Sequence, residues 1–198
     1  MFARISIFCL ALLASPGFSQ ELALPNNSKN PKVQIETTQG KIVLELFADK
    51  APATVNNFLG YVQSGHYDNT IIHRVSKDFV IQGGAYDANL LKKPQRKPIA
   101  LETVESLKNR RGTIAAARKL SDANSATSEF FINLVDNPQL DFQSKNSPLN
   151  QGFAVFGQIV DGIEVIDKVR KVSTTSKPGF PGLPVPTITI LSITRVSE

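Results

Sequence analysis

The chain has 198 residues, and 22 Lys and Arg against 17 Asp and Glu give it a formal net charge of +5. Hydrophobic residues make up 41% of the chain and charged residues 20%, as in folded globular domains rather than disordered ones. No apolar run reaches the roughly 18 residues of a bilayer span, which excludes a membrane-embedded body. One Cys and two His leave no Cys-based or His-rich metal site, and we expect neither a metal nor a cofactor.

Residues 1–19 have the pattern of an export signal peptide. Arg4 provides the positive charge, and residues 5–14 form an apolar stretch of the usual length. Gly17 and Ser19 suit the −3 and −1 positions of a cleavage site, so we predict cleavage after Ser19. The apolar stretch is too short to span a bilayer comfortably, which argues against a retained anchor and against stable membrane insertion after cleavage.

Residues 20–31 are polar and predict a flexible lead-in, followed by one domain over residues 32–198. The domain is expected to begin with a β-hairpin. Residues 33–37 and 42–47 alternate between apolar and polar side chains on either side of a Gln39-Gly40 turn.

A helix is predicted next, with Pro52 in its first turn and Gly65 just after its last. Its buried stripe has the spacing i, i+3, i+4, i+7, and consists of Val55, Phe58, Leu59 and Val62.

Short β-like runs and a second helix follow. The runs are residues 70–75, 79–82, 112–117, 129–135, 153–160 and 186–196. The second helix begins after Asp161-Gly162 and has Ile163, Ile166 and Val169 on its apolar face. We interpret residues 87–109, 143–151 and 173–184 as loops. Many short strands and two distant helices favour an all-β barrel or sandwich over a parallel α/β fold.

Motifs for nucleophilic, metal or nucleotide chemistry are missing from the sequence, which contains no HEXXH, P-loop or Gly-flanked serine. His73 within TIIHRV is typical of a packed strand residue, so a hydrolase using His73 is the weakest functional alternative. The basic residues are scattered in loops without stacking aromatics, and we expect no nucleic-acid binding.

Several short motifs in one fixed order carry more information. They are GKIVLEL, APATVNNF, GHY, HRV, FVIQGG, RGTIAAAR, SEFFINL and FAVFGQIVDG. In this order the chain resembles the cyclophilin family of peptidyl-prolyl cis–trans isomerases, and most closely its exported bacterial members, from about residue 33 to residue 196. The resemblance implies a closed eight-stranded antiparallel β-barrel capped by two helices.

The resemblance also implies the site residues. Residues matching the family's catalytic positions are Arg74, Phe79 and Gln82. Residues matching its substrate-binding positions are Val80, Ala117, Arg118, Glu129, Phe131, Gln139, Leu140 and Phe153, with Arg118 acting through its backbone. Strand spacing alone would instead favour core packing for the phenylalanines and a surface ion pair for Arg74.

Four of these positions depart from the common eukaryotic pattern. Val80 replaces Met and Phe153 replaces His, and both keep the expected proline pocket apolar. Glu129 replaces Gln, and its carboxylate could pair with Arg74 and compete with substrate. Gln139 replaces an aromatic residue that the family uses to hold cyclosporin, so we expect weak binding of that drug.

The sequence therefore predicts a peptidyl-prolyl cis–trans isomerase that acts as a monomer on proline-containing peptides and unfolded exported proteins. Its expected location is the bacterial periplasm, with full secretion as an alternative. The other functional hypothesis is a cyclophilin-fold peptide-binding module or holdase chaperone with weakened catalysis. The presence of Arg74 argues against it, and the departures at Glu129 and Gln139 keep it open.

Overall fold

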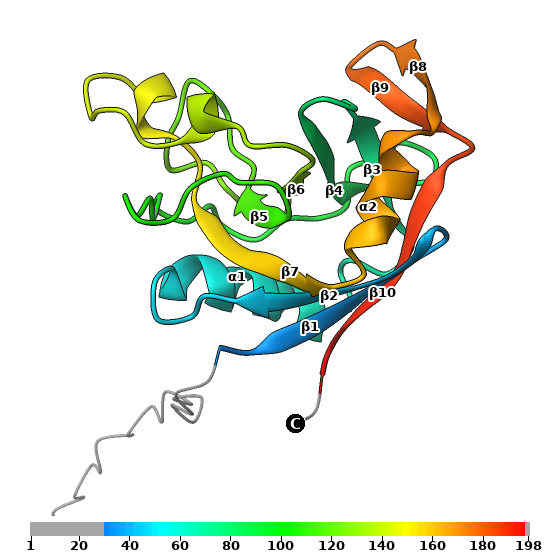
Figure 1. Cartoon of the computed structure of the whole chain (residues 1–198), viewed down its shortest axis with the longest axis horizontal. Helices are drawn as coiled ribbons and strands as arrows, with labels where there is room; N and C mark the ends of the chain where they lie inside the picture. The colour runs from blue at the N-terminus through cyan, green and yellow to red at the C-terminus, as the bar shows by residue number, and fades with distance from the viewer. Residues whose placement is uncertain (1–29, 197–198) are drawn as a thin grey trace, which may run out of the picture.

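The computed structural model describes residues 30–196, and its body is a closed β-barrel (Figure 1). Neighbouring strands are antiparallel and follow the order β1-β10-β3-β4-β6-β5-β7-β2. The barrel strands are β1 (Lys32–Thr37), β2 (Gly40–Leu46), β3 (Thr70–Val75), β4 (Val80–Asp87), β5 (Thr113–Ala116), β6 (Phe130–Asn133), β7 (Val155–Asp161) and β10 (Ile188–Arg195). The prediction of an eight-stranded antiparallel barrel is confirmed, and the predicted export signal lies outside the described residues.

Both predicted helices are present. In α1 (Pro52–Gln63) the predicted stripe is buried, and Gly65 follows the helix at a φ of +64°, a backbone conformation that glycine adopts without strain. Phe58 of α1 packs against Phe130 and Phe156 from two barrel strands, with ring centroids 5.9 and 5.2 Å away. In α2 (Ile163–Arg170), Val165 and Val169 line the barrel interior. The helices thus bury their apolar faces against the barrel.

Glu102 fixes the long segment between β4 and β5, because its carboxylate binds the start of α1. Ala51, at the N-terminal boundary of α1, makes no side-chain hydrogen bond to the helix. Instead, Glu102 accepts hydrogen bonds from the backbone N–H groups of Ala53 and Thr54, at 3.0 and 2.6 Å, and from the Thr54 hydroxyl at 2.7 Å. A distant Glu therefore satisfies N–H groups that the helix itself leaves free.

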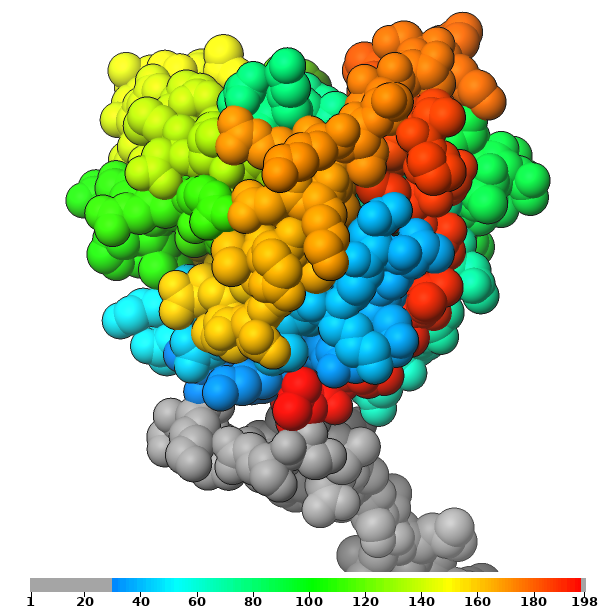
Figure 2. All heavy atoms as spheres, turned by 45° about the vertical axis from the view of Figure 1, so that its right-hand side comes forward, coloured from blue at the N-terminus to red at the C-terminus, as the bar shows by residue number. Residues whose placement is uncertain are grey.

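The interpretation of residues 173–184 as a loop was wrong. They form a hairpin of β8 (Ser173–Lys177) and β9 (Phe180–Val185), which stands out from the barrel beyond α2 (Figure 2). The sequence of this hairpin lacks the alternation of apolar and polar residues that usually marks a strand. The five residues of β8 are all polar and all exposed, and β9 contains two prolines and a glycine. Tertiary packing holds the hairpin in place instead. The Phe180 ring lies edge-on to Tyr86, with ring centroids 5.0 Å apart, and β9 packs against β3.

Side-chain alternation along the strands produces two separate apolar clusters. Phe130 and Ile132 of β6 point into the main core, whereas Phe131 between them belongs to a second cluster on the outer face. We call this second group the outer cluster. Its buried members are Val80, Ala115, Ala117, Phe131 and Val155, and its partly buried members are Phe47, Phe79, Leu107, Leu140 and Phe153.

Candidate active site

The outer cluster forms an apolar surface across four neighbouring strands. Phe131 of β6 lies opposite Gln82 of β4 and Ala115 of β5, and Ala115 in turn pairs with Val155 of β7. The rings of Phe131 and Phe153 are nearly perpendicular, with centroids 5.4 Å apart. Phe79 and Phe153 remain partly exposed at its margin. Solvent reaches the cluster at its partly buried members, which include Phe79, Leu140 and Phe153, and Phe131 lies buried beneath them.

Arg74 stands at the edge of the outer cluster. It lies on β3 directly opposite Gln82, and its Nη1 is 3.4 Å from Gln82 Oε1. Its guanidinium carbon is 5.7 Å from the centroid of the Phe79 ring, within the range of a cation–π contact. A permanently charged, planar donor is thus held beside an apolar surface and remains partly exposed.

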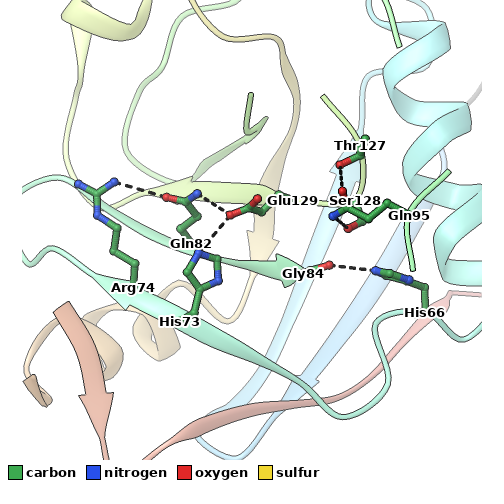
Figure 3. A network of polar contacts seen from close by, with 9 residues as sticks. All are labelled: His66, His73, Arg74, Gln82, Gly84, Gln95, Thr127, Ser128 and Glu129. Carbon is green, nitrogen blue, oxygen red and sulfur yellow. Dashed lines mark hydrogen bonds and ion pairs between the residues drawn. The ribbon is translucent and has the colours of Figure 1, made fainter. Parts of the chain in front are cut away.

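A chain of polar contacts continues from Arg74 across the sheet (Figure 3). Gln82 Nε2 donates a 2.9 Å hydrogen bond to Glu129 Oε1, and His73 Nε2 lies 3.2 Å from the same oxygen. Within residues 30–196 no ion pair joins Glu129 to Arg74, because the Gln82 amide lies between them. The expectation that Glu129 competes for Arg74 therefore finds no support in the geometry.

The environment of Glu129 favours its charged form. Burial by itself raises the pKa of this carboxyl, but the hydrogen bond and charge of His73, the bond from Gln82 and the charge of Lys92 outweigh it. The net effect is a lowered pKa. Glu129 is thus an anion held in place beside Gln82 and His73.

His73 is a buried strand residue, as the sequence suggested. Its ring packs edge-on against Tyr86 at 4.9 Å and Phe180 at 6.2 Å. Its Nδ1 is buried without a hydrogen-bond partner, so its polar contact within the described chain is the one to Glu129. This arrangement orients a carboxylate and offers His73 no serine or cysteine to activate as a nucleophile.

Arg118 contributes through its side chain as well as its position. Its Nε and Nη2 donate to the carbonyl of Gly152 at 2.9 and 2.8 Å, and Nη2 also donates to the carbonyl of Pro148 at 2.6 Å. The guanidinium stacks on the Phe153 ring at 4.7 Å, and burial lowers the pKa of Arg118. The resemblance implied a backbone role for Arg118, and its side chain in addition fixes the segment that carries Phe153.

Two buried asparagines, Asn109 and Asn137, hold the segments that carry Leu140 and Phe79. Neither asparagine was predicted as a site residue. Asn137 Nδ2 donates to the carbonyl of Phe79 at 3.0 Å and to Oδ1 of Asn133 at 2.8 Å. Asn109 Nδ2 donates to the carbonyl of Leu140 at 3.0 Å. Asparagine in a strand-to-loop segment gives no signal of such a role before the fold is known.

The structure places the predicted site residues on two adjoining features. The residues in the outer cluster are Phe79, Val80, Ala117, Phe131, Leu140 and Phe153, and those in the polar row beside it are Arg74, Gln82 and Glu129. Gln139 is exposed next to Leu140, with Nε2 donating to Asn137 Oδ1 at 3.1 Å. Among residues 30–196, no group of three His, Cys, Asp or Glu side chains is arranged to hold a metal ion. In the same range, no helix is both long enough and apolar enough to cross a membrane.

Comparison with known proteins identifies relatives that cover nearly the whole described chain. The sequence model of the family described as "Cyclophilin type peptidyl-prolyl cis-trans isomerase/CLD" matches residues 32–195. Peptidyl-prolyl cis-trans isomerase B of Escherichia coli is 45% identical over 166 residues, which cover 84% of this chain and 99% of the relative. Peptidyl-prolyl cis-trans isomerase A of Dickeya dadantii is 38% identical over 192 residues, 97% of both chains.

Solved structures agree with these sequence matches. The crystal structure of a Cryptosporidium parvum cyclophilin-type peptidyl-prolyl cis-trans isomerase superposes with a TM-score of 0.70 at 28% identity. It covers 85% of this chain and 99% of that one. A second crystal structure of that protein, in the presence of the dipeptide Ala-Pro, gives a TM-score of 0.69, also at 28% identity.

Proposed function

The chain belongs to the cyclophilin-type peptidyl-prolyl cis–trans isomerase family and is an isomerase of that type, and from this premise we propose that it accelerates X–Pro isomerisation during the folding of exported proteins. In this proposal Arg74 stabilises the twisted amide, while the outer cluster holds the prolyl ring. The placement of Arg74 beside Phe79, at the open edge of that cluster, is the observation that carries the proposal.

The chemistry requires no bond to be broken. Resonance gives the X–Pro amide partial double-bond character, and its uncatalysed isomerisation takes tens to hundreds of seconds. When the amide twists, conjugation is lost and the prolyl nitrogen becomes pyramidal, with a lone pair that can accept a hydrogen bond. A donor that meets this nitrogen only in the twisted state binds the transition state better than either planar form, and so lowers the barrier.

Arg74 suits this task because its guanidinium is always charged and its donors form a planar fork. Gln82 Oε1 on one side and the Phe79 ring on the other restrict where that fork can lie. An acceleration of about 10⁵-fold needs about 7 kcal/mol, and one preorganised donor removed from an active site typically costs about 3–4 kcal/mol. In the proposal the remainder comes from orientation of the amide by Gln82 and by the backbone near Arg118.

The outer cluster supports binding of proline. Its partly exposed members Phe79, Leu140 and Phe153 present apolar surface, backed by the buried Phe131 and Val80, and such a surface suits an apolar pyrrolidine ring. A relative of the same fold has been crystallised in the presence of Ala-Pro. We therefore propose proline-containing peptides and unfolded chains as the substrates.

The proposed location is the periplasm, with full secretion as the alternative. It rests on the export-signal pattern of residues 1–19, with its single positive charge and its short apolar stretch. The full chain should therefore be produced in a Gram-negative host, and the mature protein recovered by osmotic shock. We expect a periplasmic product whose mass corresponds to cleavage after Ser19, and a cytoplasmic product of full mass would contradict the location.

The catalytic proposal is tested by two-dimensional NMR exchange on a short peptide with a single X–Pro bond. The wild-type protein should accelerate cis–trans exchange at substoichiometric concentration, and Arg74→Ala should lose at least about 100-fold of that acceleration. Arg195→Ala removes an exposed arginine on β10 and should behave as wild type. Equal rates in Arg74→Ala and wild type would contradict the proposed role of Arg74.

The alternative function is a peptide-binding module or holdase, and the same variants distinguish it. A holdase would suppress aggregation of an unfolded client equally well with Arg74→Ala, and the folded wild type would leave peptide exchange at its uncatalysed rate. Loss of exchange catalysis in Arg74→Ala with wild-type catalysis intact would exclude this alternative.

A further inference from the structure

Glu129 holds its negative charge at the margin of the outer cluster, and residues 30–196 contact only one of its two oxygens. Gln82 Nε2 and His73 Nε2 both contact Oε1. Within residues 30–196, Oε2 has no hydrogen-bond partner, yet it is not among the buried unpartnered atoms, so it must reach the surface. The side chain is 21% exposed, and Figure 3 shows the contacts from Gln82 and His73 meeting at one oxygen, with no contact drawn to the other.

The Glu129 side chain lies on the same face of the sheet as the outer cluster. Glu129 directly precedes β6 and contacts Gln82, which lies opposite Phe131, so the Glu129 and Phe131 side chains share one face, while Phe130 between them enters the core. The backbone carbonyl of Glu129 also accepts a 2.9 Å hydrogen bond from the N–H of Ala117, a buried member of the outer cluster. The carboxylate thus lies next to the surface on which the prolyl ring is proposed to bind.

The spacing sets which part of a substrate this carboxylate meets. Two residues of extended chain span about 7 Å, so Glu129 lies about that far from Phe131 along the strand. A peptide whose proline contacts Phe131 covers the same span with one or two residues. The side chain that reaches Glu129 therefore belongs to a residue one or two positions from the proline.

The neighbouring charges leave Glu129 available to a cationic side chain. Arg74 is separated from it by the Gln82 amide, and no lysine or arginine nitrogen lies within 4.0 Å of its oxygens in the described part of the chain. Lys92 is close enough to contribute to the lowered pKa of Glu129 but forms no ion pair with it. The contact between His73 Nε2 and Oε1 holds the carboxylate in place, so the position of the carboxylate is set before a substrate binds.

We infer that Glu129 is a specificity-determining residue, which makes this isomerase favour proline sites with a Lys or Arg one or two positions from the proline. The inference rests on the proposed function, because it assumes that the prolyl ring binds the outer cluster. The expected preference is modest, about threefold to fivefold in Kd, since the ion pair is partly exposed to solvent. It should decrease at high ionic strength for the same reason.

The test uses a set of alanine-rich peptides that each contain one proline. Lys, Gln or Glu is placed at one of the four positions within two residues of the proline, on either side. Peptide Kd is measured by NMR titration, and exchange catalysis is measured on the same samples, at low salt and at 0.5 M salt. The proteins are wild type, Glu129→Gln, and Glu164→Gln, which removes an exposed carboxylate from α2 as a charge-matched control.

We expect at least one position at which wild type and Glu164→Gln bind the Lys peptide about threefold to fivefold more tightly than the Glu peptide. Glu129→Gln should abolish that difference, so that its Kd values for the Lys and Glu peptides become equal. A lack of Lys preference at all four positions, or a preference that survives in Glu129→Gln, would overturn the inference. Because Kd is measured separately from exchange, failure of catalysis on every peptide would contradict the proposed function without affecting this result.

Discussion

Asn137 allows the support of the active site to be tested separately from its chemistry. This side chain is 1% exposed, and its Nδ2 donates to the carbonyl of Phe79, to Oδ1 of Asn133 and to the carbonyl of Val135, at 3.0, 2.8 and 3.2 Å. Its Oδ1 accepts from Gln139 at 3.1 Å. One buried amide thus connects the β3–β4 turn, which carries Phe79, to β6 and to the segment that follows β6.

Asn137→Asp removes the Nδ2 donor and keeps the side-chain volume. The amide has two N–H bonds, which three acceptors share, and each lost hydrogen bond costs about 1 kcal/mol, so the free energy of unfolding should fall by about 2 kcal/mol. Asn137→Ala should cost at least as much, because it adds a small cavity. Both variants should also raise the KM for peptide, since Phe79 and the segment carrying Leu140 lose a shared anchor.

The assay is urea unfolding followed by far-UV circular dichroism, with the m-value checked for constancy between variants. Asn146→Ala, in an exposed loop, is the matched control and should change stability by less than about 0.5 kcal/mol. A loss below about 1 kcal/mol for Asn137→Asp would refute the reasoning, because the two N–H bonds of the amide would then contribute almost nothing.

Three other predictions concern the helix cap, the pH dependence of stability and drug binding. Glu102→Ala should lower stability by about 1–2 kcal/mol by removing the acceptor for two N–H groups of α1; thermal unfolding beside the exposed Glu105→Ala checks this, and equal melting temperatures would contradict it. Burial lowers the pKa of His66 from 6.5, outweighing its bond to the Gly84 carbonyl, so the unfolded state binds the proton more readily and stability should decrease as the pH falls below about 6.5. The free energy of unfolding should change by at most about 1.4 kcal/mol per pH unit. In urea unfolding, His66→Gln should show a weaker dependence of this free energy on pH, and an unchanged dependence would assign it to other groups. Gln139→Trp should strengthen cyclosporin binding, as measured by calorimetry. An affinity equal to that of wild type would show that position 139 does not limit cyclosporin binding.

Much of the fold could be predicted because local patterns agree with it. Alternation in β1 and β2 and the helical spacing of Val55 and Phe58 are signals within a few residues of one another, and each element formed where the pattern indicated. The hairpin of β8 and β9 could not be predicted in this way. Its strands are held by Phe180 against Tyr86 on β4, a contact between segments more than 90 residues apart.

The site shows the same division between residue identity and geometry. Motif order was sufficient to indicate Arg74 and Gln82 as neighbours, and the structure places them opposite each other on β3 and β4. It was not sufficient for Glu129, which sequence reasoning paired with Arg74 and the structure pairs with His73. Which of two nearby groups a carboxylate contacts depends on rotamers and on the intervening amide, and neither is encoded by spacing along the chain.

The central claim is that Arg74 acts on the twisted amide and not on the bound ground state. The most direct test measures two quantities on one X–Pro peptide with wild type and Arg74→Ala: the Kd, by NMR titration, and the isomerisation rate of the bound peptide at saturation, by exchange spectroscopy. We predict that Arg74→Ala changes Kd by less than about threefold, while the bound-state rate falls by at least about 100-fold. A Kd weakened by tenfold or more, with the bound-state rate preserved, would contradict the account and make Arg74 a binding residue.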